Sequence, residues 1–458
     1  MWGRASACRT TTGEIRIASL NPFRGLPNPR EVWAWAMYDL ANQSFTLLIV
    51  TLFFSIYFQN TIATTPEQGK QAWGLAVGAS SLVVVVLGPV LGALADFGGR
   101  KKAWLVALGL ACSLMTMVLA AFGPGDLLPA AIVFVLANIA FMGGENFLAS
   151  FLPEIAKREH LSRVSAIGWT FGYLGAMLVL PIAGVVLAVM GVNDAAMRTL
   201  FFAAGLWFLL NLLPALLFLK ERKTPEALPP GRSLWSVGFV RLWETAREAR
   251  RFGSLMRFLV AMTVYSAGMS IIIAFAGDLA FQYLGAGPIF IVYCWVLSLV
   301  AGVGSISTGW FQVRFGHRRT ICVSLVLWLC TSAGAAMLPP PGGGPLWPIW
   351  LIGLGIGLGL GMTGNAGRTL VGAFTPRHKT AEFFGLWGLS YKLASVVGPP
   401  LYGLVFASAG QGPALWMVAG FFLVGLVLMG LVDVRAGERA TLESEAEFGR
   451  IQAGQAQQ

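Results

Sequence analysis

Residues 92–102 read GALADFGGRKK, and residues 309–319 read GWFQVRFGHRR. Each stretch follows an apolar run and ends in a cluster of positive charges. Gly92 and Gly309 are 217 positions apart, and so are Gly99 and Gly316. Two copies of one short pattern, half a chain apart, indicate that the chain contains a duplicated unit.

The rest of the chain has the composition of a membrane protein. Hydrophobic residues make up 56% of it, charged residues 12%, and its mean hydropathy is +0.70, whereas a soluble domain carries about 25% charged residues. A helix that spans a bilayer needs about 20 apolar residues. Twelve apolar segments approach or exceed this length: 33–59, 71–95, 103–122, 128–152, 163–190, 198–219, 256–284, 288–312, 320–338, 346–374, 381–408 and 413–433. We therefore expect an all-α polytopic membrane protein with twelve transmembrane helices.

The segments divide the chain into five parts. Two six-helix bundles, 31–219 and 256–433, flank a linker, 220–255. An N-terminal segment, 1–30, precedes them, and a polar tail, 434–458, which we expect to be flexible, follows. In the linker, Trp235, Phe239 and Trp243 share one helical face and arginines occupy the other, which predicts a helix lying in the membrane interface.

Positive charge is distributed on one side of the predicted bundle. Lysines and arginines cluster in the N-terminal segment, the alternate loops, the linker and the tail, whereas only Lys70 and Arg198 lie on the other side. The positive-inside rule then places both termini in the cytoplasm. The net charge of +11 is therefore a topology signal, and we expect no nucleic-acid partner.

The two repeated stretches resemble the loop 2–3 signature of the major facilitator superfamily, Gly-x-x-x-Asp-x-x-Gly-Arg-Lys. The first copy departs from it at Phe97, where the family often has arginine, and the second has Val313 in place of the acid. The resemblance implies two parallel six-helix repeats and a latch that controls the conformational state. The gating residues that it implies are Gly92, Asp96, Gly99, Arg100, Gly309, Arg314, Gly316 and Arg318, to which we add Glu382.

Three further stretches resemble the vacuole-effluxer branch of that superfamily: WAMYDLANQSF (33–43), FLPEIAKREHLSRVSAIGWTFGYLGA (151–176) and AEFFGLWGLSYKLASVVGPPLYG (381–403). The branch implies export of amino acids. In helix 10 the family reads Gln-x-x-Ser-Arg-Ser, and here only Arg368 is retained. In helix 7, Ala267 stands where the family often has aspartate.

Charged side chains within the apolar segments are the candidate binding groups, because an ion near the centre of a bilayer costs roughly 2.5–3.5 kcal/mol on insertion scales. We expect Asp39 and the other charged side chains of the cavity-lining helices to face an aqueous cavity. The alternative is a purely structural ion pair. Arg368 and Glu382 lie at similar predicted depths and could pair. The candidate substrate- or ion-binding residues are Tyr38, Asp39, Asn42, Glu145, Asn146, Tyr173, Asp278, Asn365, Arg368 and Lys392.

Residues 353–364 read GLGIGLGLGMTG. This run does not indicate nucleotide binding, because no strand precedes it and no Gly-Lys-Ser/Thr follows. Gly353, Gly357 and Gly361 have the small-xxx-small spacing that allows helices to pack closely. Close packing is the favoured interpretation, with gate flexibility as the alternative.

Together these features predict a secondary transporter that moves a small polar metabolite by alternating access. The resemblance favours an amino acid or related zwitterion and ion-coupled efflux, with protons acting through Asp39 or Glu145. We expect a monomer in a bacterial inner membrane, without a cofactor, metal site or enzymatic activity. The alternatives are a non-transporting relative that acts as a receptor or assembly factor, and a transporter of lipids or large apolar compounds.

The predicted topology can be tested with single cysteines introduced into a variant without native cysteines. A cysteine at Gly343, in the loop PPPGGGP, should react with an impermeant thiol reagent added outside intact cells. A cysteine at Ser233, in the linker, should react only after the cells are permeabilised. The opposite labelling pattern would invert the orientation.

Overall fold

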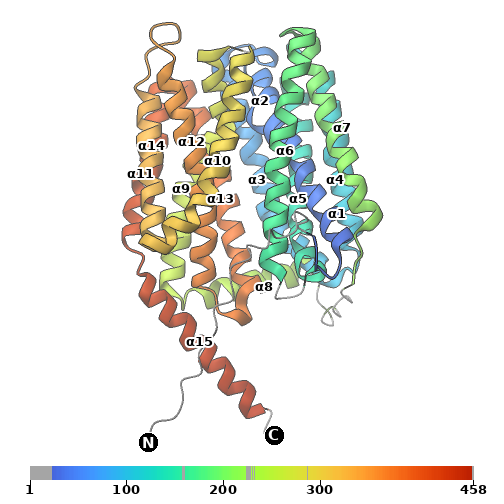
Figure 1. The fold of residues 1–458 in the computed structure, drawn as a ribbon, viewed down its shortest axis with the longest axis vertical. Coiled ribbons are helices and arrows are strands. Elements are labelled where there is room, and N and C mark those ends of the chain that lie inside the picture. Colours follow the sequence, from blue (N-terminus) through green and yellow to red (C-terminus); the bar gives the residue numbers. More distant parts are fainter. Residues whose placement is uncertain are drawn as a thin grey trace, which may run out of the picture.

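A computed structural model of the chain describes residues 23–156, 160–222, 228, 231, 233–285 and 287–455. All regular elements in these ranges are helical (Figure 1). The first half contains α1 (Pro29–Gln43), η1 (Ser44–Thr51), α2 (Phe53–Tyr57), η2 (Phe58–Ile62), α3 (Pro66–Phe97), α4 (Lys101–Val118), η3 (Leu119–Ala121), α5 (Leu127–Ile155), α6 (Leu161–Met190) and α7 (Asp194–Phe218). After α8 (Leu234–Ala249), the second half contains α9 (Gly253–Leu284), α10 (Pro288–Phe315), α11 (His317–Ala336), α12 (Trp347–Ala373), η5 (Arg377–Lys379), α13 (Thr380–Ala409) and α14 (Gln411–Gly430), followed by α15 (Val434–Gln455).

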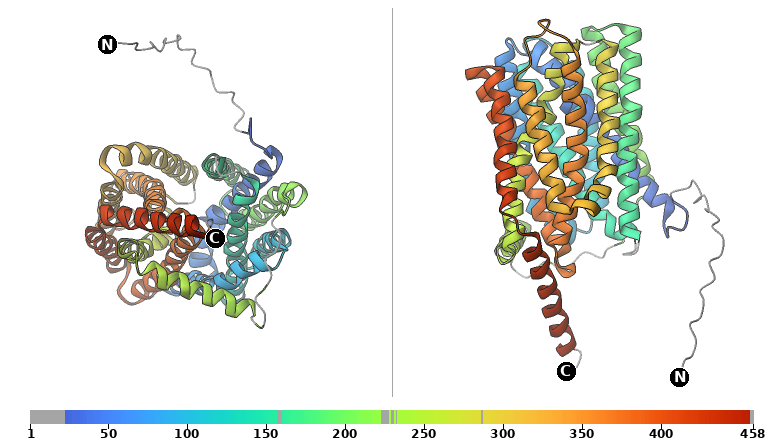
Figure 2. Two further views of the ribbon diagram at one scale, coloured as in Figure 1. Left: turned by 90° about the horizontal axis from the view of Figure 1, so that it is seen from below. Right: turned by 60° about the vertical axis from the view of Figure 1, so that its left-hand side comes forward.

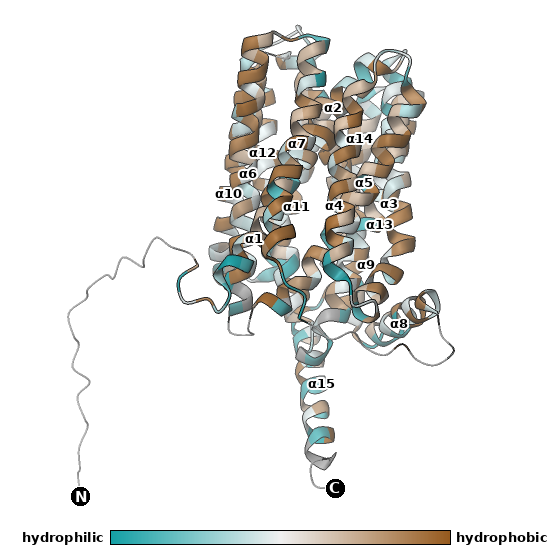
Figure 3. Cartoon of the chain, turned by 90° about the vertical axis from the view of Figure 1, so that its right-hand side faces the viewer, coloured by the Kyte–Doolittle hydropathy of each residue, from teal (hydrophilic) through white to brown (hydrophobic). Residues whose placement is uncertain are grey.

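The long helices match the predicted apolar segments. Among the described residues, 11 helical stretches are long and apolar enough to cross a membrane, and the first of them joins α1, η1, α2 and η2 into Pro29–Ile62. Helix α13, with 30 residues, is the twelfth long helix of the bundle. Apolar residues cover much of the bundle, and α15 extends beyond it (Figure 3). The expected all-α polytopic fold is confirmed.

We name the two ends of the bundle by their loops. Helix α1 begins and α14 ends at the end from which α15 projects, and α8 lies there too (Figures 1 and 2). We call this the basic end, because it carries Arg100, which precedes α4, and Arg318 and Arg319, in the first turn of α11. Lys70 and Arg198 lie near the starts of α3 and α7, at the opposite end.

The same helix pairs pack together in both halves. In the first half α1 packs on α6 and α7, α3 packs on α5, and α4 packs on α5 and α7. In the second half the equivalent helices form the equivalent pairs: α9 with α13 and α14, α10 with α12, and α11 with α12 and α14. The repeated loops are also alike in backbone, since Gly99 and Gly316 have φ of 58° and 83°. This left-handed conformation favours glycine, which explains why both copies carry one there.

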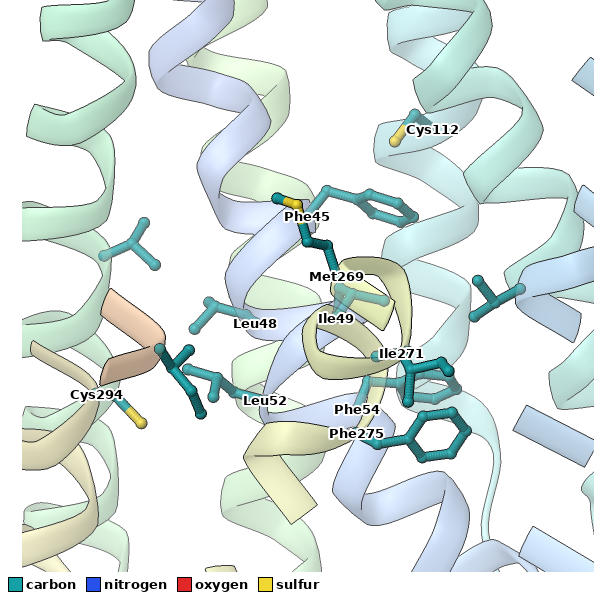
Figure 4. Packing of buried hydrophobic residues seen from close by; sticks show 14 of the residues in the cluster. Phe45, Leu48, Ile49, Leu52, Phe54, Cys112, Met269, Ile271, Phe275 and Cys294 are labelled. Atoms are coloured by element: carbon teal, nitrogen blue, oxygen red, sulfur yellow. The ribbon is translucent and has the colours of Figure 1, made fainter. Parts of the chain in front are cut away.

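The halves meet mainly where α3 packs on α13 and α6 packs on α10. Their backbones touch at glycines: a Cβ atom on Gly74 would lie 2.3 Å from the carbonyl oxygen of Pro399, and one on Gly277 would lie 2.2 Å from that of Thr51. Apolar side chains of η1 and α2 pack near those of α9, among them Phe54 and Phe275 (Figure 4).

The C-terminal tail and the linker between the halves both lie outside the bundle. The tail expected to be flexible is instead helical over Val434–Gln455, since its alanine, glutamate and arginine residues favour helix. Phe448 stacks on His378, in the turn between α12 and α13, with ring centroids 4.2 Å apart. The linker forms α8 as predicted. Residues 1–22 and the loop positions Lys157 and Arg158 lie outside the described ranges.

The glycine spacing in α12 corresponds to close packing on α10. A Cβ atom on Gly353 would lie 2.5 Å from the ring of Tyr293, and one on Gly361 would lie 2.0 Å from the carbonyl oxygen of Ala301. By contrast, a Cβ atom on Gly364, one turn further along α12, would have no such neighbour within 4 Å.

These two glycines form a matched pair for mutagenesis. Gly361→Ala should lower the thermal unfolding midpoint of the purified protein, because overpacking of a tight contact costs about 1–3 kcal/mol. Gly364→Ala should leave the midpoint unchanged or raise it, since alanine favours helix by up to about 1 kcal/mol. Equal midpoints for the two variants would contradict the packing interpretation.

Candidate functional site

Four helices bring charged side chains together in the middle of the bundle. Asp39 on α1 and Glu145 on α5 belong to the first half, whereas Arg368 on α12 and Lys392 on α13 belong to the second. Acidic groups therefore face basic groups across the boundary between the halves. The sequence predicted all four as binding residues, and tertiary structure places them in one region.

Asp39 and Arg368 attract each other without touching. Their charges interact. Within the described part of the chain, however, neither side chain forms a hydrogen bond, and neither lies within 4.0 Å of an oppositely charged atom. The carboxylate of Asp39 fits beside Gly168 of α6, where a Cβ atom would lie 2.6 Å from its Oδ2. Two half-buried charged groups without a direct partner among the described residues are costly in a bilayer, which makes this the candidate place for a polar ligand or water.

Glu145 and Lys392, the second pair of opposite charges, each form a hydrogen bond with an asparagine side chain. Asn42 donates from Nδ2 to Glu145 Oε1 at 2.7 Å, and Lys392 donates from Nζ to Asn146 Oδ1 at 2.5 Å, across the boundary between the halves. Glu145 and Lys392 attract each other but are not in ion-pair contact. Although Glu145 lies in the middle of the bundle, its side chain is exposed. The space between the halves is therefore not filled by side chains at this depth.

The remaining predicted binding residues occupy different surroundings. Tyr38 points into the core of the first half, beside Phe208, and its buried hydroxyl has no partner among the described residues. Tyr173 of α6 lies beside Ser305 of α10, and Asn365 donates to the carbonyl oxygen of Ser305 at 2.9 Å. The Tyr173 and Asn365 side chains thus meet near one point of the α6–α10 contact, whereas Tyr38 is a core residue in this conformation.

Asp278 lies away from the central charges, in a closed contact at the opposite end. Lys70 Nζ is 2.8 Å from its Oδ2, with side-chain exposures of 3% and 1%. Asn60 donates to Oδ1 at 2.7 Å and Gln282 donates to Oδ2 at 2.9 Å. Because Lys70 and Asn60 belong to the first half and Asp278 to the second, this network ties the halves together. Sequence reasoning treated Lys70 as a loop residue; its only signal was a lone lysine at the start of an apolar segment.

The predicted gating residues lie at the basic end. Asp96 Oδ2 is 3.3 Å from Arg241 Nη1 of α8, and the Arg241 guanidinium stacks on Phe97. In the second copy, Arg318 donates to the carbonyl oxygen of Gly430 at 2.6 Å. Arg100 and Arg314 are exposed, and Gly92 and Gly309 have open space beside them. The sequence did not predict the contact of the first signature with α8.

Glu382 does not form the possible pair with Arg368. It lies in the first turn of α13, 3.7 Å from Lys379 Nζ, whereas the charge of Arg368 interacts with that of Asp39. Lys379 also donates to Glu248 of α8 at 2.8 Å, and this hydrogen bond raises the pKa of Lys379 above its usual value. Within the described ranges, no group of three or more His, Cys, Asp or Glu side chains is arranged to hold a metal ion.

Comparison with known families gives a match over most of the chain. The profile of the family described as "Vacuole effluxer Atg22 like" matches residues 73–442. An uncharacterized MFS-type transporter of Bacillus subtilis, YxiO, is 25% identical over 87% of this chain and 94% of its own length. Autophagy-related protein 22-1 of Aspergillus fumigatus is 27% identical over 67% of this chain but only 54% of its own length.

Solved structures share the fold at low identity. The nucleoside transporter NupG superposes with a TM-score of 0.63 at 16% identity, covering 88% of this chain and 98% of its own. A D-xylose–proton symporter superposes with a TM-score of 0.65 at 14% identity, covering 87% and 96%. These likenesses support the major facilitator fold.

The buried contact at the opposite end can be tested by breaking one side of it. Lys70→Met should open this end, because removal of one partner from a buried ion pair costs about 3–5 kcal/mol. The reporter is a single cysteine at Ser270, which is 5% exposed. Its reaction rate with a small thiol reagent should rise strongly in Lys70→Met.

A double variant provides the control for that experiment. Lys70→Met combined with Asp278→Leu removes both charges, so no buried ion is left without a partner. The labelling rate at position 270 should return towards that of the parent. Equal rates in the single variant and the parent would show that this ion pair does not hold the end closed.

Proposed function

Because the chain belongs to the Vacuole effluxer Atg22-like family of major facilitator transporters, we propose that it carries a small zwitterionic metabolite, with an amino acid favoured. The chain is a membrane transporter by family and fold. The finer assignment rests on the arrangement of charges between its halves, with Asp39 and Glu145 on one side and Arg368 and Lys392 on the other.

Asp39 and Arg368, which form no ion pair within the described ranges, carry the proposal. An α-amino acid presents an ammonium group and a carboxylate a few ångströms apart. Its ammonium group would bind Asp39 or Glu145, and its carboxylate would bind Arg368, whose planar guanidinium suits bidentate contacts with carboxylates. Lys392 would add a second positive charge. One bound zwitterion would then compensate charges on both halves, which a large apolar substrate would not do.

Such a substrate would also couple binding to movement. A ligand shifts a conformational equilibrium only if it binds one state better, and a zwitterion that bridges both halves favours the state in which they approach each other. The close contacts at the opposite end and the exposed Glu145 support a structure in which the site is reached from the basic end. When the substrate is bound, the basic end would close and the Lys70–Asp278 contact at the opposite end would open.

Orientation, coupling and direction are further parts of the proposal. The distribution of lysine and arginine supports a cytoplasmic basic end in a bacterial inner membrane. Protons would be the coupling ion, with Asp39 or Glu145 as the titrating group, and the family description supports efflux. Because one chain supplies both halves of the site, a monomer would suffice.

The substrate class can be tested by ligand-induced thermal shift and by binding to the purified protein. After a screen of the standard amino acids, the best ligand is compared with its carboxamide and with its analogue lacking the amino group. Both analogues should bind weakly to the parent. Arg368→Ala should weaken binding of the amino acid about 30-fold or more, because loss of one partner in a buried charge contact costs about 2–5 kcal/mol.

Three further variants make the assignment specific. Arg368→Lys should retain part of the affinity, and Asp39→Asn should abolish the preference for the amino acid over its analogue lacking the amino group. Arg435→Ala, on the projecting α15, removes the same charge away from the site and should bind like the parent. Unchanged affinity in Arg368→Ala, or equal binding of the carboxamide by the parent, would exclude the proposed zwitterion site.

A further inference from the structure

Helix α8 presents an apolar stripe that the described chain does not cover. Trp235, Phe239 and Trp243 follow one another at four-residue spacing and are 51%, 42% and 63% exposed. The helix lies along the edge of the basic end, beside the bundle rather than beneath its centre (Figures 2 and 3). Aromatic side chains at this level match the headgroup region of a bilayer, where tryptophan is enriched.

Three arginines lie next to this stripe and have no acidic partner among the described residues. Arg247 is in the last turn of α8, and Arg250 and Arg251 follow directly after the helix. All three are exposed, and none forms an ion pair within the described residues. The Arg250 guanidinium lies 5.9 Å from the ring of Trp243, so a positive charge sits beside an interfacial aromatic group.

The acidic residues of α8 do not neutralise this cluster. Glu248 forms an ion pair with Lys379, with 2.8 Å between Oε2 and Nζ. The exposed Glu244 forms no ion pair with Arg247 in the described structure. Arg257, near the start of α9, adds another exposed positive charge. An anion at this surface would therefore meet unpaired guanidinium groups.

The inner side of α8 is fixed to the end of α3. A Cβ atom on Gly238 would lie 2.4 Å from the carbonyl oxygen of Pro89, so the two helices touch backbone to backbone. The exposed Arg241 contacts Asp96 and Phe97. Whatever binds the outer side of α8 is therefore one helix away from the gating loop at residues 92–102.

We propose that α8 and the turn after it form a binding site for anionic phospholipid headgroups in the leaflet at the basic end. The aromatic stripe inserts among the acyl chains near the headgroups, and Arg247, Arg250 and Arg251 bind the headgroup phosphates. Guanidinium groups form bidentate contacts with phosphate. Lipid bound there holds α8, and with it Asp96, in the position seen in this structure. This role does not depend on the identity of the transported substrate.

Lipid retention by the full-length protein tests the site directly. The purified protein is delipidated, mixed in neutral detergent at low salt with equal amounts of phosphatidylglycerol and phosphatidylcholine, and examined by native mass spectrometry. The parent should retain phosphatidylglycerol in preference. Arg247→Gln/Arg250→Gln/Arg251→Gln should reduce this preference by roughly fivefold for each arginine removed. Trp243→Ala should lower retention of both lipids.

A matched triple variant separates a local site from net charge. Arg435→Gln/Arg439→Gln/Arg450→Gln removes three exposed arginines from α15, which projects away from the bundle, and should keep the parent's preference. Hydrogen exchange at residues 94–100 should slow when phosphatidylglycerol is added to the parent, but not when it is added to the α8 variant. No preference in the parent, or an equal loss in both triple variants, would overturn the proposal.

Discussion

The buried ion pair between Lys70 and Asp278 is the contact on which the observed conformation depends. It joins the two halves at one end of the bundle, with both side chains almost fully buried. Two ions in such surroundings are stable only when they are paired and hydrogen-bonded, and Asn60 and Gln282 complete the shell. The halves cannot separate at this end without exposing or isolating these charges, so this contact closes the end in the observed conformation.

The charged side chains in the middle of the bundle are arranged differently. At the opposite end an acid and a base are in direct contact, whereas in the middle Asp39 and Arg368 stay apart and Glu145 and Lys392 are held by amides. Charges that only stabilised the fold would be expected to pair like Lys70 and Asp278. Their separation across the boundary between the halves therefore sets them apart from the structural contact at the other end, and it is the reason why we propose a ligand with both signs of charge.

The duplicated architecture explains where these differences arise. Equivalent helices pack in equivalent pairs, and both loop signatures use a glycine with positive φ. The two copies differ in side-chain partners: the acid of the first signature, Asp96, contacts α8, whereas Arg318 of the second binds the carbonyl oxygen at the end of α14. Since α8 occurs once in the chain, it makes the two otherwise similar halves unequal at the basic end.

The sequence alone determined the twelve helices, their division into two repeats, the amphipathic α8 and the charged residues of the middle region. These follow from local composition, since a helix that spans a bilayer must be long and apolar, and a charged residue within it is rare because it is costly. Tertiary structure decided the partners. Lys70 read as a loop cation and Asp278 as a binding group, yet they pair; Tyr38 stands beside Asp39 in sequence, yet points into the core. Successive residues of a helix face different neighbours, and contacts such as Lys392 with Asn146 join positions far apart in the chain, so only the packing of the halves specifies them.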